Sequence, residues 1–299
     1  MSSIKAWVIA ARLRTLPLAF SAIGMGGILA YMYGSFDPVV FTLCILTTIG
    51  LQVLSNFAND YGDFINGADH DARKGPIRMV QSGAISVVAM KRAVYVSGLV
   101  ALVSGLTLLF MAFKVLNVNF MLFLLLGISS IGAAVKYTVG KTPYGYAGFG
   151  DVFVFIFFGL VGVLGTCFLQ TGWFKWNLLY PAFAMGFFSV GVLNINNIRD
   201  IESDVQAGKK SLPVRIGAIS AKVYHTLLIV GAFVCFFLFV YQEINYLIAY
   251  LFAMSLPFFL YNIIQTWKRE GSQLDSLLRQ LALSILLFVL LFAIGISLV

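Results

Sequence analysis

Most of the twelve acidic residues gather in two short stretches, 56–71 and 194–204, each of which mixes aspartates with asparagines. If each stretch is helical, spacings of three and four residues put two aspartates and one asparagine on the same face. Each face then offers two carboxylates and an amide oxygen to a single point. The two sets are Asn56, Asp60 and Asp63, and Asn196, Asp200 and Asp204.

Carboxylates held this close together favour a bound cation. Two like charges 4 Å apart repel by about 4 kcal/mol at an effective dielectric constant of 20. Donors that are all oxygens suit Mg²⁺, which proteins commonly hold between one or two carboxylates and substrate phosphates. The chain has only two histidines, His70 and His225, so no His/Cys cluster favours zinc. The predicted cofactor is therefore Mg²⁺.

Basic residues follow each acidic stretch at a similar distance. Metal-binding carboxylates beside cationic side chains make a site for a polyanion such as a diphosphate. Because the neighbouring segments are strongly apolar, the expected substrate has a charged head and an apolar tail, such as a polyprenyl diphosphate. The basic residues are Arg73, Lys74 and Arg78 after the first stretch, and Lys209, Lys210 and Arg215 after the second.

The segments that position these residues are apolar enough to cross a membrane. Sixty per cent of the 299 residues are hydrophobic and 11% are charged, with a mean hydropathy of +0.94, which excludes an ordinary water-soluble domain. Runs of about twenty apolar residues recur, and each is predicted to be a helix. We therefore expect an all-α polytopic membrane protein with nine spans: 17–34, 38–58, 87–113, 118–136, 151–170, 177–198, 221–241, 245–266 and 280–298.

The distribution of lysine and arginine predicts the orientation. Eighteen of the twenty basic residues fall on one side of these spans, and only Lys114 and Lys175 fall on the other. We expect the protein to lie in the cell inner (plasma) membrane. The positive-inside rule then places its N-terminus in the cytoplasm and its C-terminus on the outer side. The net charge of +8 is not gathered in a separate basic domain, so no nucleic-acid partner is expected, and the oligomeric state is left open.

The two polar loops share an order of features. In each, acids are followed by bases and then by the letters Gly-Ala-Ile-Ser, at 83–86 and at 217–220. This order predicts a single domain, 1–299, with two pseudo-repeated halves, about 12–136 and 151–266, and a last helix. The two serines, Ser86 and Ser220, are expected to cap the helices that follow.

Several motifs together resemble the UbiA superfamily of intramembrane prenyltransferases, and best of all its branch that prenylates 1,4-dihydroxy-2-naphthoate. The resemblance covers residues 12 to about 225. One departure is Ala72, where related sequences place an acid directly before the arginine. The motifs are Asn59-Asp-Tyr-Gly-Asp63, Arg73-Lys-Gly-Pro-Ile-Arg78, Tyr137-Thr-Val-Gly, Pro143-Tyr-Gly-Tyr146, Gly148-Phe-Gly-Asp151 and Asn196-Asn-Ile-Arg-Asp-Ile-Glu-Ser-Asp204.

The resemblance implies an enzyme with nine helices around a central cavity that opens laterally to lipid. The implied reaction moves a polyprenyl group from polyprenyl diphosphate to the aromatic acid 1,4-dihydroxy-2-naphthoate. Diphosphate and CO₂ are lost, and the product is a demethylmenaquinone of menaquinone biosynthesis. Mg²⁺ would stabilise the charge that develops on the leaving diphosphate.

Within the reaction that the resemblance implies, individual residues have expected roles. Asp60, Asp63, Asp200 and Asp204 are assigned to two Mg²⁺ sites and to catalysis, with Asn56, Asn59, Asn197 and Asp69 as further ligands. The candidate substrate-binding residues are Arg73, Arg78, Gln81, Lys141, Tyr144, Arg199, Lys209 and Arg215. Tyr137, with Tyr144, is expected to shelter the allylic cation, and Asp151 is expected to contact the acceptor or act as a base.

Two alternatives stay open at this point. Within the same enzyme class, the acceptor would be 4-hydroxybenzoate or another aromatic acid. In another class, carboxylates in a membrane protein with a repeated half fit an ion-coupled transporter. Transporter acids usually lie near the middle of the membrane on broken helices, whereas these flank long basic loops, which favours the enzyme.

Overall fold

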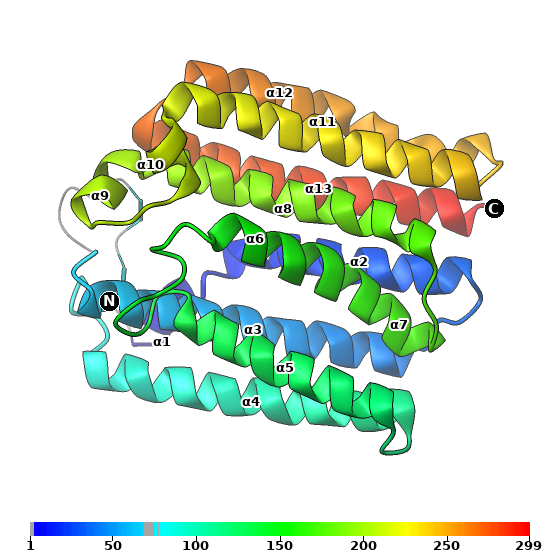
Figure 1. Cartoon of the computed structure of the whole chain (residues 1–299), viewed down its shortest axis with the longest axis horizontal. Helices are drawn as coiled ribbons and strands as arrows, with labels where there is room; N and C mark the ends of the chain where they lie inside the picture. Colours follow the sequence, from blue (N-terminus) through cyan, green and yellow to red (C-terminus); the bar gives the residue numbers. More distant parts are fainter. Residues whose placement is uncertain (1–2, 69–74, 77) are drawn as a thin grey trace.

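The chain is helical throughout the part that the structure describes. The computed structural model describes residues 3–68, 75–76 and 78–299, and these residues contain no strand. Within them, nine helices are long and apolar enough to cross a membrane, which confirms the predicted all-α polytopic fold. They run side by side (Figure 1).

The spans and loops have the following bounds. The spanning helices are α1 and α2 (Ser3–Ala11, Leu16–Met32), α3 (Pro38–Ile65), α4 (Val87–Phe113), α5 (Val118–Lys136), α6–η2–α7 (Gly150–Val154, Phe155–Gly165, Thr166–Thr171), α8 (Leu179–Arg199), α11 (Ala218–Glu243), η4–α12 (Leu247–Ser255, Leu256–Lys268) and α13 (Asp275–Ser297). Short helices α9 (Ile201–Gln206) and α10 (Leu212–Ile216) lie between α8 and α11, and η1 (Leu13–Thr15), η3 (Trp176–Leu178) and η5 (Gly271–Leu274) are single turns.

Three predicted boundaries need correction. The first span begins near residue 4 rather than 17. The basic residues Lys5, Arg12 and Arg14 concealed a helix that passes through a break at Arg12 (φ 49°) into η1 and α2. Helix α3 continues past residue 58 to Ile65 because its last polar turns are bonded to other segments, such as Thr138 Oγ1 to the Ala58 carbonyl. Ser86 caps α4 as expected, but α11 begins at Ala218, so Ser220 lies inside that helix.

One half of the bundle is a solid aromatic core. Helices α8, α11, α12 and α13, with η4, enclose Phe188, Phe236 and Phe288, none of which has exposed surface. The rings of Phe188 and Phe236 meet the ring of Phe288 at centroid distances of 5.2 and 4.7 Å, close to edge-to-face. Such pairs contribute about 0.5–1.5 kcal/mol each beyond their buried area. This half gives α8 a fixed position.

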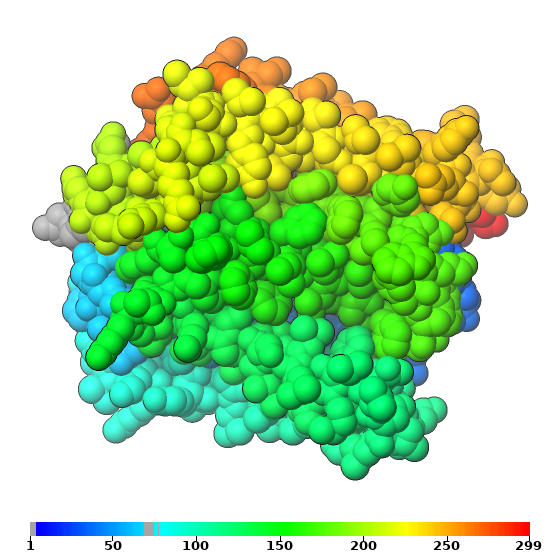
Figure 2. All heavy atoms as spheres, viewed as in Figure 1, coloured from blue at the N-terminus to red at the C-terminus, as the bar shows by residue number. Residues whose placement is uncertain are grey.

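The other half encloses a cavity of about 520 Å³. Its wall comes from α2, α3, α4, α5, the α6–α7 helix and α8. Asp63 and Cys44 both line it, and the nineteen positions that separate them on α3 correspond to about 28 Å of helix rise. In Figure 2 a hollow lies between the atoms of α5 and those of η2 and α7, which agrees with the expected lateral opening.

The two termini lie at opposite ends of the bundle, and the polar loops lie at the end of the N-terminus. The N-terminus, α9 and α10 lie at one end of the bundle, called here the loop end, and the C-terminus lies at the other (Figure 1). The acidic ends of α3 and α8 therefore meet at the same end. The repeated halves predicted from the sequence stay a prediction.

Gly62 allows the turn at 137–139 to approach α3, and its replacement tests this contact. A Cβ at Gly62 would lie 2.6 Å from Thr138 Oγ1 and 2.7 Å from the Thr138 carbonyl oxygen. We expect Gly62→Ala to destabilise the protein by about 1–3 kcal/mol through overpacking. The matched control is Gly127→Ala on α5, where a Cβ meets nothing within 4 Å and alanine favours the helix. Thermal unfolding in detergent measures both, and equal midpoints would contradict the contact.

Candidate active site

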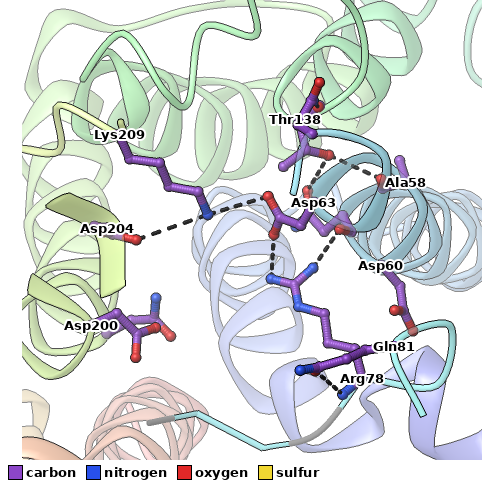
Figure 3. Close-up of polar contacts among 12 residues, drawn as sticks. Ala58, Asp60, Asp63, Arg78, Gln81, Thr138, Asp200, Asp204 and Lys209 are labelled. Atoms are coloured by element: carbon purple, nitrogen blue, oxygen red, sulfur yellow. Dashed lines mark hydrogen bonds and ion pairs between the residues drawn. The ribbon is translucent and has the colours of Figure 1, made fainter. Parts of the chain in front are cut away.

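Asp63 is the centre of the polar end of the cavity. Its carboxylate is 2% exposed and forms an ion pair with the Arg78 guanidinium. The Tyr146 hydroxyl donates to Asp63 Oδ1 at 2.5 Å, and Lys209 Nζ lies 3.2 Å from the same oxygen. Figure 3 shows both cationic side chains converging on this carboxylate. Three elements distant in sequence thus fix one acid.

Lys209 also reaches the second acidic stretch. Its Nζ lies 3.9 Å from Asp204 Oδ1 and 4.7 Å from the centre of the Tyr146 ring, so it stands between two carboxylates (Figure 3). Burial raises the pKa of Asp204 to about 6, although Lys209 opposes this, and the charges of Asp200 and Asp63 raise it further. Burial and the neighbouring carboxylates together therefore outweigh the effect of Lys209 on the pKa of Asp204.

The polar residues of the second acidic stretch stay on one helical face, although the helix is interrupted there. Helix α8 ends at Arg199, and Asp200 has φ −98° and ψ 7°. The Asp204 amide nevertheless donates to the Asp200 carbonyl at 2.8 Å, which carries the helical spacing into α9. Asn196, Asp200 and Asp204 consequently all line the cavity, as their spacing predicts.

Asp60 points away from the cavity, contrary to the expected shared face with Asp63. Its carboxylate accepts hydrogen bonds from the Met79 amide (3.1 Å) and the Val80 amide (3.4 Å), and it is 1% exposed. In Figure 3 it lies apart from Asp63 and Lys209. The turn at 78–80 draws this side chain aside, so the structure places it as a support for the turn that carries Arg78.

The asparagines of the first stretch do line the cavity. Asn56 Nδ2 donates to the Ala11 carbonyl at 2.9 Å, which ties α3 to the end of α1. Asn59 Oδ1 accepts from Thr138 Oγ1 at 3.2 Å. Asn197 lines the opposite wall. All three amides are near the aspartates that were predicted to hold a metal.

The remaining basic candidates have other partners or positions. Arg199 is buried and donates to both Asp200 oxygens, at 2.9 and 2.7 Å, and to Asp275 at 2.6 Å. Arg215 donates to the carbonyls of Lys210 and Ala147, which joins two loops. Neither arginine lines the cavity.

Four further predicted residues complete this comparison. Gln81 Oε1 faces the Arg78 amide at 3.5 Å and so supports the same turn as Asp60. Lys141 is exposed and does not line the cavity. Asp69 and Arg73 lie outside the described residues.

An aromatic wall borders the polar end. Tyr144 stacks on Phe153 with ring centroids 4.0 Å apart, and Tyr137 meets the edge of Tyr144 at 5.3 Å. Burial raises the pKa of both tyrosines, and nearby carboxylates raise that of Tyr137 further. Both hydroxyls therefore stay protonated at neutral pH. This wall can face a cation or a flat ring.

The structure adds residues that spacing did not single out. Tyr146 donates to Asp63, and Ser211 Oγ donates to Asp204 Oδ2 at 3.1 Å. Asp275 links Arg199 to Arg14 (3.3 Å), so it joins α13 and η1 to the site. Tyr146 lay in a quoted motif, which was a usable signal, whereas nothing near Asp275 in the sequence indicated a role.

The chain is similar to known proteins over most of its length. The model of the UbiA prenyltransferase family matches residues 18–286. The 1,4-dihydroxy-2-naphthoate octaprenyltransferase of Haemophilus influenzae is 42% identical over 98% of this chain and 96% of its own. The enzyme of the same name from Escherichia coli is 45% identical over 86% of this chain and 83% of its own.

Solved structures show the same fold. A UbiA homolog from Aeropyrum pernix K1 is 18% identical, with a TM-score of 0.68 over 95% of this chain and 97% of its own. A UbiA homolog from Archaeoglobus fulgidus bound to DMAPP and Mg²⁺ is 16% identical, with a TM-score of 0.64 over 96% of this chain and 99% of its own. With a family model that matches most of its length, the chain belongs to the UbiA prenyltransferase family.

Proposed function

We propose that this protein transfers a polyprenyl group from polyprenyl diphosphate to 1,4-dihydroxy-2-naphthoate, releasing CO₂ and diphosphate and forming a demethylmenaquinol, the hydroquinone form of a demethylmenaquinone. Two relatives with this activity in their names are 42% and 45% identical to the chain. The acceptor assignment rests on that similarity. 4-Hydroxybenzoate is the alternative acceptor, and no feature of the cavity favours it.

The shape of the cavity carries the proposal. Its polar end, with Asp63, Asp204 and Lys209, continues into an apolar space lined by residues such as Leu106 and Phe123. A substrate with a diphosphate head and an isoprenoid tail matches this division. An ion or a small polar solute would leave the apolar part unused.

The donor set fits Mg²⁺. Asp63 and Asp204 lie on either side of one cationic group, and Asn59, Asn197 and Asp200 add further oxygens from the two facing walls. Among the described residues, no three His, Cys, Asp or Glu side chains gather into a complete metal site. Mg²⁺ commonly binds through one or two carboxylates together with substrate phosphates. When bound, it would stabilise negative charge on the departing diphosphate.

The chain's own cations bind and orient the diphosphate. Lys209 exchanges its two carboxylate partners for diphosphate oxygens when the head group enters. Arg78 keeps its contact with Asp63 and faces the head group from the side of the turn at 78–80. The aromatic wall excludes water from the allylic carbon, so that the aromatic acceptor, and not water, bonds to this carbon.

The proposal includes the membrane orientation. The loop end lies in the cytoplasm and the C-terminus outside the inner (plasma) membrane. The charge asymmetry supports this, because Lys114 and Lys175 fall at the end away from the acidic loops. In this orientation the diphosphate head group and the naphthoate enter the cavity from the cytoplasm, and the polyprenyl tail enters it from the bilayer.

Purified protein tests the reaction directly. With Mg²⁺, polyprenyl diphosphate and 1,4-dihydroxy-2-naphthoate, we expect a prenylated product and one CO₂ per turnover, detected by mass spectrometry. Chelation of the metal should stop the reaction. Product from 4-hydroxybenzoate alone would reject the acceptor assignment, and no product with any acceptor or tail length would reject the activity.

A pair of neighbouring aspartates tests the site. Asp63→Asn should lower kcat by about 10²–10³-fold, because it removes a carboxylate that would hold Mg²⁺ against the departing diphosphate. Asp60→Ala should act mainly on stability, by about 1.5–3 kcal/mol, because it leaves the Met79 and Val80 amides without their charged acceptor. Steady-state rates and thermal unfolding separate the two effects, and a larger kcat loss for Asp60→Ala would contradict the assignment.

A further inference from the structure

Asp151 differs from the other acids of the cavity wall. Five acids of the described chain line the cavity, and four of them form ion pairs with arginine or lysine. Within the same part of the chain, no basic side chain pairs with Asp151. The four paired acids are Asp63, Asp200, Asp204 and Asp275.

Within the described chain, the Asp151 carboxylate lacks an ion pair, and one of its oxygens lacks a hydrogen bond. Its Oδ2 is buried and has no hydrogen-bond partner among the described residues. The Tyr224 hydroxyl of α11 interacts with the carboxylate, but it is a neutral partner and does not line the cavity. A buried acceptor without a donor costs about 1–3 kcal/mol, so such a group needs an explanation. A ligand that donates a hydrogen bond supplies one.

Asp151 lies beside the aromatic wall at the polar end of the cavity. The Tyr137 hydroxyl is near enough to Asp63, Asp151 and Asp204 to feel the charge of all three. A Cβ on Gly150 would lie 3.1 Å from the Tyr137 hydroxyl oxygen, so the start of α6 packs directly on this ring. The acid is therefore close to the aromatic wall and to the diphosphate site, without belonging to the latter.

We propose that Asp151 is the catalytic base that takes the proton of the acceptor hydroxyl next to the carboxyl-bearing ring carbon. This role rests on the proposed function. The other groups nearby do not suit it: Asp63 and Asp204 are held by cations, and the tyrosines of the wall stay protonated.

The proton transfer balances within one turnover. The ring carbon forms a bond to the allylic carbon as the bond from that carbon to the diphosphate oxygen breaks. The acceptor O–H proton passes to Asp151, which leaves a ketone beside a carbon that carries both the prenyl group and the carboxylate. This β-keto carboxylate loses CO₂ to give an enolate. The enolate oxygen takes the proton back from Asp151, and the base is restored without any oxidant.

A variant and a modified acceptor together test direct contact. Asp151→Asn should lower kcat with 1,4-dihydroxy-2-naphthoate by about 10²–10⁴-fold, the usual range for general base catalysis. Its KM for polyprenyl diphosphate should be unchanged. Wild-type protein should lose as much activity with 1-methoxy-4-hydroxy-2-naphthoate, which has no hydroxyl proton next to the carboxyl-bearing carbon. The variant assayed with the methoxy acceptor should lose no more activity than either change causes alone, because both changes remove the same proton transfer.

Controls keep each outcome interpretable. Asp151→Glu should regain part of the lost kcat, and Glu270→Gln, at an exposed acid outside the cavity, should match the wild type. Binding of polyprenyl diphosphate by Asp151→Asn shows that the variant is folded. If Asp151→Asn keeps wild-type kcat, or if its loss multiplies with that of the methoxy acceptor, the base assignment is wrong. If the wild type makes no product from the dihydroxy acceptor, the proposed function itself fails.

Discussion

Two carboxylates from opposite halves of the bundle, Asp63 on α3 and Asp204 on α9, share a single lysine at the boundary of an apolar cavity. Such charges repel strongly where the effective dielectric constant is low, so the pair depends on a cation between them. Lys209 supplies that cation in the protein alone. A metal-bound diphosphate supplies both the cation and a new partner for the lysine in the proposed complex.

The rest of the fold keeps these two acids apart yet facing each other. The aromatic core around Phe288 fixes α8, and Arg199 with Asp275 anchors the end of α8 to α13. On the other side, Gly62 admits the turn that brings Tyr146 to Asp63. A rigid wall and a closely packed loop thus hold one acid each.

The sequence predicted what depends on local periodicity. Apolar runs gave the nine spans, and spacing placed Asn196, Asp200 and Asp204 on one wall. It did not predict the direction of Asp60, because the amides that capture its carboxylate belong to a turn about twenty residues away. Arg215 was expected at the diphosphate, but backbone carbonyls of two loops hold it, and only the tertiary fold brings those together.

The most direct test of this account compares Lys209→Met with the wild type in two titrations, one with Mg²⁺ alone and one with Mg²⁺ and polyprenyl diphosphate. If Lys209 stands in for the cation and then binds the diphosphate, the variant should bind Mg²⁺ alone more tightly and polyprenyl diphosphate more weakly. Unchanged Mg²⁺ affinity, or polyprenyl diphosphate binding equal to that of the wild type, would contradict it.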